Sequence, residues 1–255
     1  MVDRQADTSR EQLERIAEGY ETSTDFDSVI SRYAGRLIAD KVAGRHVLEC
    51  GAALGEMTEL LLKVADVDVV EAAEHYVRLL RQRFGPRLVI HHSLAEHFNP
   101  PCRYDVVVVA SLLHHFNRPM DVLRHMRSWV VPGGRLIATV PNMLSMHRRL
   151  GVAMGVTDRP DAASSRNIRF GQPGRFDRDS IAHLLHDAGW RMTEIGGFLI
   201  KPFPNDLMQS LNLSDNILDG LFELGRQLPE LASQIMVTAE VSADPGDGSS
   251  PAAHD

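Results

Sequence analysis

Short apolar runs alternate with segments of helical periodicity along most of this chain. The runs rich in valine, isoleucine and leucine predict seven strands, at residues 46–48, 67–70, 88–91, 105–109, 135–140, 191–195 and 234–241. Between them, apolar residues recur at helical spacing and predict helices at 27–42, 55–65, 74–84, 119–130 and 178–188. Regular alternation of this kind is typical of parallel strands joined by crossover helices. The pattern therefore predicts a doubly wound α/β sheet.

Two long segments, 141–176 and 197–232, do not follow the alternation. They come after the fifth and sixth predicted strands, so we expect them over the carboxyl edge of the sheet, where open α/β folds bind ligands. Long excursions from a compact domain are usually lids or binding loops. We therefore expect a main domain at 27–241 with two lid insertions. Residues 1–26 predict a partly disordered N-terminal arm with a helix, and the Pro-, Gly- and Ser-rich residues 242–255 predict a disordered tail.

The composition argues against several classes of function. The 255 residues are 44% hydrophobic and 24% charged, which suits a globular enzyme, and the formal net charge is -7. Because an acidic chain has no overall positive field for phosphate backbones, nucleic acid is not expected as a partner. No apolar run approaches the roughly 20 residues that span a bilayer, so no membrane association is expected. The two cysteines, Cys50 and Cys102, form no C-x-x-C pair, so we expect no disulfide framework, no metal site and a cytoplasmic location.

The first candidate binding element is a small-residue turn in HVLECGAALGEMTELLL, residues 46–62. A predicted strand ends at Glu49, and a helix begins after Gly55. Gly51 and Gly55 lack a Cβ, so the backbone here can approach a ligand, and the helix N-terminus adds N–H donors. The Glu49 carboxylate can accept a hydrogen bond from an ammonium group at this turn. The turn alone is also typical of sites that bind nicotinamide cofactors, or of tight packing between a strand and a helix.

A second acid narrows the choice of ligand. Glu71 closes the apolar run that begins after Asp66, about 20 residues beyond the glycine turn and at the tip of the adjacent predicted strand. A carboxylate in that position can accept hydrogen bonds from both hydroxyls of a ribose. The two acids together therefore favour a ligand that contains a ribose.

The third element is YDVVVVASLLHHF, residues 104–116, followed by VPGGRLIATVPN, residues 131–142. Together with the two acids and the glycine turn, these blocks resemble class I S-adenosylmethionine-dependent methyltransferases over about residues 44–141. The resemblance implies a Rossmann-like methyltransferase fold with a seven-stranded, mostly parallel sheet in the order 3-2-1-4-5-7-6. It also implies S-adenosylmethionine as the cofactor and S-adenosylhomocysteine as its product.

The resemblance assigns cofactor contacts to the tips of the first four strands. These residues are Glu49, Gly51, Ala53 and Gly55 at the first tip, Glu71 and Ala72 at the second, Ser93 and Leu94 at the third, and Ala110 at the fourth. The first group would face the methionine part of the cofactor, the second its ribose and the third its adenine. Three residues depart from the family pattern: Ala53 replaces a glycine, Glu49 replaces the commoner aspartate, and Ser93 replaces an aspartate that often binds the adenine amine.

Two histidines after the fourth predicted strand are the candidate catalytic residues. His114 and His115 would lie near the transferred methyl group. A histidine with an unperturbed pKa of about 6.5 is a competent base near neutrality. His115 is the candidate for the base that takes the proton from a hydroxyl acceptor. The same pair also suits packing and capping of the turn between strand and helix, so both roles stay open.

The two long excursions carry the candidate contacts to the methyl acceptor. VPNMLSMHRRLG, residues 140–151, and KPFPN, residues 201–205, resemble bacterial small-molecule methyltransferases of quinone-precursor and antibiotic pathways. Arg148, Arg149 and Lys201 suit a carboxylate or phosphonate on the acceptor, because their cationic groups bind such anions.

The predicted function is O-methylation of a small molecule. Many relatives close an N-terminal helix over the cofactor, and Tyr20 in that part of the chain is a further candidate for an acceptor contact. Small-molecule N-methylation stays open, as do a nicotinamide-dependent oxidoreductase and a non-catalytic binding protein of the same fold. The sequence lacks a G-x-G-x-x-G motif, which argues against the oxidoreductase. A homodimer is common among relatives and is a further expectation.

Overall fold

The structure is a computed structural model, and it describes residues 14–18 and 25–241. Residues 14–18 are helical. The expectations for the rest of the N-terminal arm, including Tyr20, and for the tail at 242–255 fall outside the described residues.

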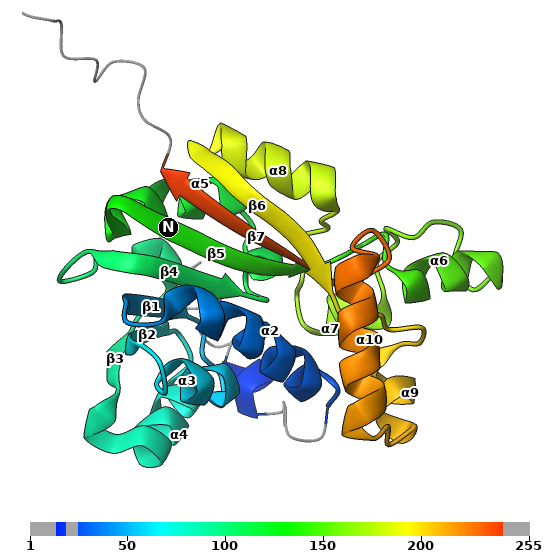
Figure 1. Ribbon diagram of the computed structural model, residues 1–255, viewed down its shortest axis with the longest axis horizontal. Coiled ribbons are helices and arrows are strands. Elements are labelled where there is room, and N and C mark those ends of the chain that lie inside the picture. Colours follow the sequence, from blue (N-terminus) through cyan, green and yellow to red (C-terminus); the bar gives the residue numbers. More distant parts are fainter. Residues whose placement is uncertain (1–13, 19–24, 242–255) are drawn as a thin grey trace, which may run out of the picture.

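A seven-stranded sheet forms the centre of the described chain (Figure 1). Its strands are β1 (His46–Cys50), β2 (Asp66–Glu71), β3 (Val89–His92), β4 (Tyr104–Ala110), β5 (Val130–Pro141), β6 (Trp190–Phe198) and β7 (Gln234–Val241). They lie in the order β3-β2-β1-β4-β5-β7-β6. Neighbours are parallel except at β7, which runs antiparallel to β5 and β6. The predicted fold class and strand order are confirmed.

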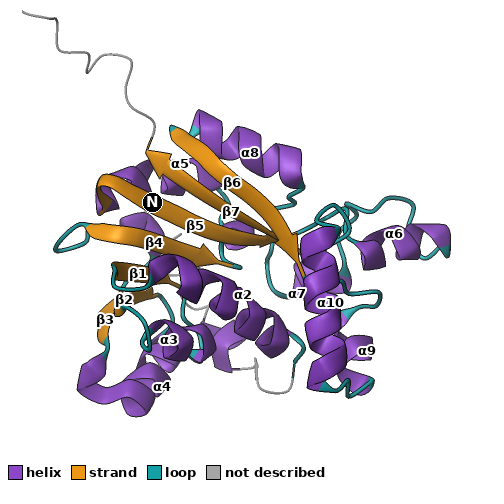
Figure 2. Cartoon of the chain, viewed as in Figure 1, coloured by secondary structure: helices purple, strands orange, loops and turns teal. Residues whose placement is uncertain are grey.

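Helices cover both faces of the sheet and one of its edges (Figure 2). On the faces are α2 (Asp27–Val42), α3 (Glu56–Leu61), α4 (Glu74–Phe84), α5 (Pro119–Met126) and α8 (Arg178–Asp187). The insertions add α6 (Met146–Ala153), α7 (Ser165–Arg169), α9 (Asn205–Ser210) and α10 (Asp215–Gln227). Single 3-10 turns lie at Gly85–Arg87, Ala95–His97, Leu113–His115 and Arg127–Trp129. Within the described ranges, no helix combines the length and the apolar character needed to cross a membrane.

Several predicted boundaries differ from the structure, and two of the differences have a clear local cause. Helix α3 ends at Leu61 rather than at residue 65, because the chain turns there to enter β2. Strand β5 begins at Val130 rather than at residue 135, because Val130 already pairs with Tyr104 of β4. The pairing register then shifts, so residues 131–134 bulge from the strand where a separate turn was expected.

Two apolar layers join the sheet to its helices. The first includes Val107, Trp129 and Leu185 and packs the sheet against α5 and α8. The second includes Val108 and Phe222 and packs it against α2, α3 and α10. Val107 and Val108 are adjacent in β4, point to opposite faces and are both fully buried. Because both faces are covered, the central strands are apolar at nearly every position, which explains the continuous runs in the sequence.

Gly55 is required by packing at the start of α3. Its φ is +78°, and a Cβ there would come within 2.5 Å of Phe84 Cε2 and 2.8 Å of Leu80 Cδ2. We expect G55A to lower the free energy of unfolding by about 2–4 kcal/mol, through left-handed strain and overpacking. Urea denaturation measures the loss. Gly44 has a similar φ of +69° with no atom within 4 Å of the added Cβ, so G44A should lose only about 1 kcal/mol; equal losses in the two variants would contradict the packing argument.

Both insertions lie over the carboxyl edge of the sheet, where α6, α7, α9 and α10 gather in Figure 1. We call residues 142–176 lid 1 and residues 199–232 lid 2, since β5 and β6 extend to Pro141 and Phe198. Asn142 joins the two lids: its Nδ2 donates to the Glu230 carbonyl at 3.2 Å and to the Ala232 carbonyl at 2.9 Å. The lids are therefore connected at their base.

Candidate active site

A cavity of about 1010 Å³ lies at the carboxyl edge of the sheet, beneath both lids. Its walls come from the tips of β1, β2 and β4, from α2, from residues 14–18 and from the lids. Most of the sequence-predicted site residues line it: Glu49, Gly51, Ala53, Glu71, Ala110, His114, His115, Arg148 and Lys201. The strand order explains this convergence, because the carboxyl ends of parallel strands meet at one edge of a sheet.

The lining of this cavity leaves out five other predicted residues: Gly55, Ala72, Ser93, Leu94 and Arg149. Gly55 faces α4, as described above. Ser93 Oγ donates to the Leu94 carbonyl at 3.0 Å. Arg149 is exposed, and its Nε donates to the Leu144 carbonyl at 2.7 Å. Arg149 therefore braces the start of α6, which corrects its expected position facing the acceptor. Tyr20 lies outside the described residues.

Glu49 is a buried acid at the tip of β1. Its Oε2 accepts a hydrogen bond from the Thr58 hydroxyl at 2.7 Å, whereas its buried Oε1 has no partner among the described residues. Burial raises the pKa of Glu49 to about 7; the Thr58 bond opposes the shift and the charge of Glu71 adds to it. A buried oxygen without a donor is energetically costly. An ammonium group of a ligand in the cavity would satisfy it.

Glu71, at the tip of β2, binds the backbone of two turns. Its Oε2 accepts from the Ala53 N–H at 3.1 Å, and its Oε1 accepts from the N–H groups of Ala72 and Ala73 at 2.8 and 3.0 Å. Burial raises the pKa of Glu71, and these amides oppose the shift. The two amides use both lone pairs of Oε1, whereas Oε2 keeps a second lone pair to which a ribose hydroxyl can donate. Ala53 has a φ of +48°, a left-handed conformation that explains why a glycine is usual there.

Residues outside the motifs complete this half of the cavity. Tyr76 in the first turns of α4 lines it, as do Ile16 and Ala17 from the N-terminal helical segment. Ala17 packs against Ala73 and Tyr76. Nothing in the sequence marks these three lining residues, because apolar and aromatic residues at such positions are ordinary core residues. The N-terminal helix does cover the cavity, which was the expected place for that part of the arm.

Two acids hold the start of α4. Glu71 accepts from the N–H groups of Ala72 and Ala73 just before the helix. Glu14 of the N-terminal segment accepts from the N–H of Glu74 and from that of His75 at 3.2 Å. The first turn of a helix has N–H groups without partners inside the helix. Glu14 therefore fastens the N-terminal segment to the same turn that Glu71 organises.

The two histidines form a turn directly after β4. His114 is buried, His115 is half-buried, and their ring centroids are 4.4 Å apart. Lid 1 returns close to them, since the Gly174 N–H donates to the His114 carbonyl at 3.0 Å and a Cβ on Gly174 would lie 2.7 Å from His114 Cα. Burial lowers the pKa of His115 to about 4, and the charge of Asp27 opposes the shift. His115 is therefore neutral at pH 7 and able to accept a proton.

Positive side chains line the half of the cavity beneath the lids. They are Arg148, Arg169, Arg175 and Lys201. His147 lines the same half, and its Nδ1 lies 3.0 Å from the hydroxyl of the fully buried Ser145. Burial lowers the pKa of His147 to about 2, with further contributions from the charges of Lys201 and Arg148. His147 is therefore a neutral group in a positively charged surrounding.

Lys201 is a buried cation, 8% exposed, at the start of lid 2. Its Nζ donates to Asn205 Oδ1. Asn205 Nδ2 in turn donates to Asp27 Oδ1 at 2.6 Å and to Asp25 Oδ1 at 3.2 Å. This network fixes lid 2 to the N-terminus of α2. Lys201 was predicted from the sequence but this network was not, because Asp25 and Asp27 are 180 and 178 residues from Asn205 along the chain.

Arg148 binds other parts of lid 1. Its Nη1 donates to the carbonyls of Pro160 and Ala162 at 3.2 and 2.6 Å, and its Nη2 donates to Asn167 Oδ1 at 3.0 Å. Burial lowers its pKa, and the charge of Arg175 adds to this effect. These three hydrogen bonds thus hold α7 and the loop before it against α6. The sequence predicted an acceptor contact for Arg148 and did not anticipate this bracing of the lid.

Two neutral polar residues lie at the start of β7, between the ends of β5 and β6. Gln234 pairs with Pro141 and Phe198, and Ser233 precedes it. Both line the cavity and are 5% and 3% exposed. Gln234 Oε1 and Ser233 Oγ have no hydrogen-bond partner among the described residues. No motif in the sequence marks either residue.

The sequence profile of a family described as "Methyltransferase domain" matches residues 20–195, more than half of the chain. This protein belongs to that family. The match confirms the expected family and enzyme class, and it removes the grounds for a nicotinamide-dependent oxidoreductase. The narrower subgroup of bacterial small-molecule enzymes stays a prediction.

Other methyltransferases resemble this one at low identity. A mitochondrial ubiquinone biosynthesis O-methyltransferase from Schizosaccharomyces pombe is 22% identical over 173 residues, which are 63% of this chain. The match spans 60% of that relative's length. Among solved structures, the CcbJ methyltransferase from Streptomyces caelestis has a TM-score of 0.57 at 15% identity, covering 84% of this chain and 90% of that one.

A third relative was solved with its ligands. It is the 1,6-didemethyltoxoflavin-N1-methyltransferase from Burkholderia thailandensis, with bound 1,6-didemethyltoxoflavin and S-adenosylhomocysteine. Its TM-score is 0.58 at 16% identity, and the match covers 94% of this chain and 90% of that one. Similarity at this level confirms the fold of the methyltransferase.

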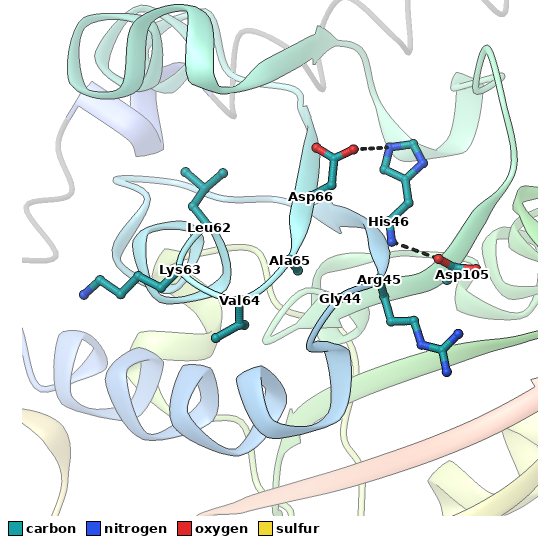
Figure 3. Close-up of a pocket in the computed structure, with 9 residues that line it drawn as sticks. All are labelled: Gly44, Arg45, His46, Leu62, Lys63, Val64, Ala65, Asp66 and Asp105. Carbon is teal, nitrogen blue, oxygen red and sulfur yellow. Dashed lines mark hydrogen bonds and ion pairs between the residues drawn. The ribbon is translucent and has the colours of Figure 1, made fainter.

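A second hollow of about 580 Å³ lies at the opposite edge of the methyltransferase sheet, at the start of β1 and β2 (Figure 3). There the His46 N–H donates to Asp105 Oδ2 at 2.9 Å, and His46 Nε2 lies 4.0 Å from Asp66 Oδ2. No sequence-predicted site residue lines it. In the described part of the chain, no group of three or more His, Cys, Asp or Glu side chains is placed to hold a metal ion.

Proposed function

We propose that this methyltransferase transfers the methyl group of S-adenosylmethionine to an oxygen atom of a small molecule that carries an anionic group. The observation that supports this most directly is where the charged side chains lie: the lids contribute four cations and one acid, Asp206, and the other acids lie on the sheet, α2 and α3. Glu49 and Glu71 line the half at the tips of β1 and β2, and four cationic side chains line the half beneath the lids. A cationic cofactor and an anionic acceptor suit these two halves.

The cofactor fits the acidic half. Glu49 Oε1 lacks a donor, which the cofactor's ammonium group supplies, and Glu71 Oε2 has a lone pair left for a ribose hydroxyl. Tyr76 and Ala17 add apolar surface next to the ribose site. When bound, S-adenosylmethionine supplies a methyl group on a positively charged sulfur, which needs no further activation. The bound S-adenosylhomocysteine of the Burkholderia thailandensis relative supports the same cofactor here.

The acceptor binds beneath the lids. Lys201 and Arg175 attract a carboxylate or phosphonate, and the neutral Gln234 and Ser233 suit hydroxyl or amine groups. The acceptor is a metabolite or natural product, in line with the resemblance to quinone-precursor and antibiotic-pathway enzymes. A cytoplasmic location and a homodimer belong to this proposal as well.

His115 is the proton acceptor for the hydroxyl that is methylated. Being neutral at pH 7, it has a lone pair for that proton, and it lies after β4, next to the Ala110 tip that borders the cofactor half. An amine acceptor would need no such base, so His115 favours oxygen over nitrogen. The relatives include both an O-methyltransferase and an N-methyltransferase.

Titration calorimetry with S-adenosylhomocysteine tests the cofactor site. We expect the wild-type protein to bind S-adenosylhomocysteine and not NADH. E71Q keeps one acceptor oxygen for the backbone amides but removes the charge that binds the ribose, so its affinity should fall about 10–100-fold. Exposed Glu223 provides the matched control, and E223Q should bind like wild type. Unchanged affinity in E71Q, or tight binding of NADH alone, would refute the assignment.

A further inference from the structure

A chain of side-chain hydrogen bonds runs through lid 1 and ends at His115. Arg148 Nη2 donates to Asn167 Oδ1 at 3.0 Å. Asn167 Nδ2 donates to Gln172 Oε1 at 3.0 Å, and Gln172 Nε2 lies 3.3 Å from His115 Nε2. All four residues line the cavity. The candidate base is therefore in contact with a hydrogen-bonded part of the lid.

Chemistry fixes the direction of each bond in this chain. A guanidinium group only donates, so Asn167 must turn its oxygen to Arg148. The Ser164 N–H and hydroxyl donate to the same oxygen at 3.0 and 2.8 Å. The Asn167 NH2 group therefore faces Gln172, which must present its own oxygen in return. The remaining amide atom of Gln172 is a nitrogen, which can only donate to His115.

The hydrogen bond donated by Gln172 determines which nitrogen of the His115 ring carries the proton. A neutral imidazole carries a proton on one nitrogen and accepts at the other. Because His115 Nε2 meets a donor, it is the accepting nitrogen, and the ring proton lies on Nδ1. The hydrogen bond that a histidine makes at one nitrogen commonly selects its tautomer in this way.

We propose that Gln172 is a positioning residue for His115. With Arg148 and Asn167 it selects the tautomer protonated at Nδ1 and keeps the Nε2 lone pair on the acceptor side of the cavity. The role rests on the proposed function: the acceptor hydroxyl replaces the Gln172 amide at Nε2, its O–H bond breaks as the Nε2–H bond forms, and its oxygen keeps the electron pair. His115 is held in this tautomer only while lid 1 is in place, because Arg148, Asn167 and Gln172 all belong to that lid.

Nitrogen NMR of the full-length protein with ring-15N histidine tests the tautomer without any acceptor. Wild-type His115 should show Nδ1 protonated and Nε2 unprotonated at pH 7, its signals being assigned by their loss in H115N. In Q172L the ring loses its donor, so the signals should move toward a mixture of tautomers. In Q172E a carboxylate faces the ring. It can only accept a hydrogen bond, so Nε2 of His115 should become protonated in order to donate one. Q172E adds almost no volume, which keeps the test open if Q172L does not fold.

Two controls belong to the same experiment. His125 Nε2 lies 2.7 Å from the Phe98 carbonyl, which only accepts, so His125 should show the opposite tautomer and serve as an internal reference. Exposed Gln209 lies outside the cavity, and Q209L should leave the His115 signals unchanged. Wild-type His115 protonated at Nε2, or a Q172E spectrum equal to wild type, would overturn the proposal. S-adenosylhomocysteine titrated into the same samples tests the proposed function separately, since failure to bind it leaves the tautomer result intact.

Discussion

Replacing Glu49 by glutamine is expected to stabilise the free protein above pH 7 and to weaken its binding of S-adenosylhomocysteine. The buried carboxylate accepts one hydrogen bond from Thr58, and its other oxygen has no partner in the described chain. A glutamine oxygen can still accept from the Thr58 hydroxyl, so the packing is kept while the buried charge is removed. The ligand's ammonium group loses its charged partner, and the affinity should fall about 10–100-fold at pH 8.

The sign of the pH dependence follows from the raised pKa of Glu49. Burial raises that pKa from 4.5 to about 7, so the folded protein binds the Glu49 proton more tightly than the unfolded chain does. The stability from this residue is complete below pH 4.5 and is lost as the pH rises through about 7. The loss amounts to about 3 kcal/mol.

Urea denaturation of wild type and E49Q at pH 5 and pH 8 measures this contribution as a difference between the two proteins. E49Q should gain stability relative to wild type as the pH rises. E223Q, with its exposed acid, should show no such gain. A gap between wild type and E49Q that stays constant across this range would mean that Glu49 titrates normally.

Replacing His115 by alanine is expected to lower turnover about 100-fold, as loss of a general base usually does. The rate is measured as S-adenosylhomocysteine formed with the best acceptor from a panel of phenolic and hydroxylated carboxylic acids. Because burial lowers the pKa of His115 to about 4, the base stays neutral until the pH falls through about 4. Protonation of His115 should therefore cause no decline in the wild-type rate near pH 6.5.

Exposed His186 provides the matched control for this experiment. Its side chain is 87% exposed, so H186A should keep the wild-type rate. Affinity for S-adenosylhomocysteine should be unchanged in H115A, which separates the chemical step from cofactor binding. A full rate in folded H115A would falsify the base assignment and leave alignment as the source of catalysis.

The sheet could be predicted because each of its strands shows the same local pattern of apolar residues. Strands covered on both faces must be apolar throughout, and Val107 and Val108 are both buried for that reason. The cavity location of Glu49, Glu71 and His115 could be anticipated as well, since strand tips of a parallel sheet meet at one edge.

The contacts within the lids could not be predicted from the sequence. Arg148 was expected to face an anion, but its partners are carbonyls and an amide that only the folded loop brings to it. Gln172 and Gln234 lie in no motif, and their importance depends on which atoms remain unpaired or fixed after folding. The packing of Gly55 against α4 was not predicted either, because the contacts of an added Cβ depend on where α4 lies in the fold.

The contact at Asn142 affects how the acceptor preference can be changed. This side chain crosses from the end of β5 to the backbone of the other insertion, so the two covers share one anchor. Grafting a single insertion from a relative would leave the carbonyls of Glu230 and Ala232 without their donor unless an asparagine is retained. Specificity should therefore transfer between relatives only when both insertions are exchanged together.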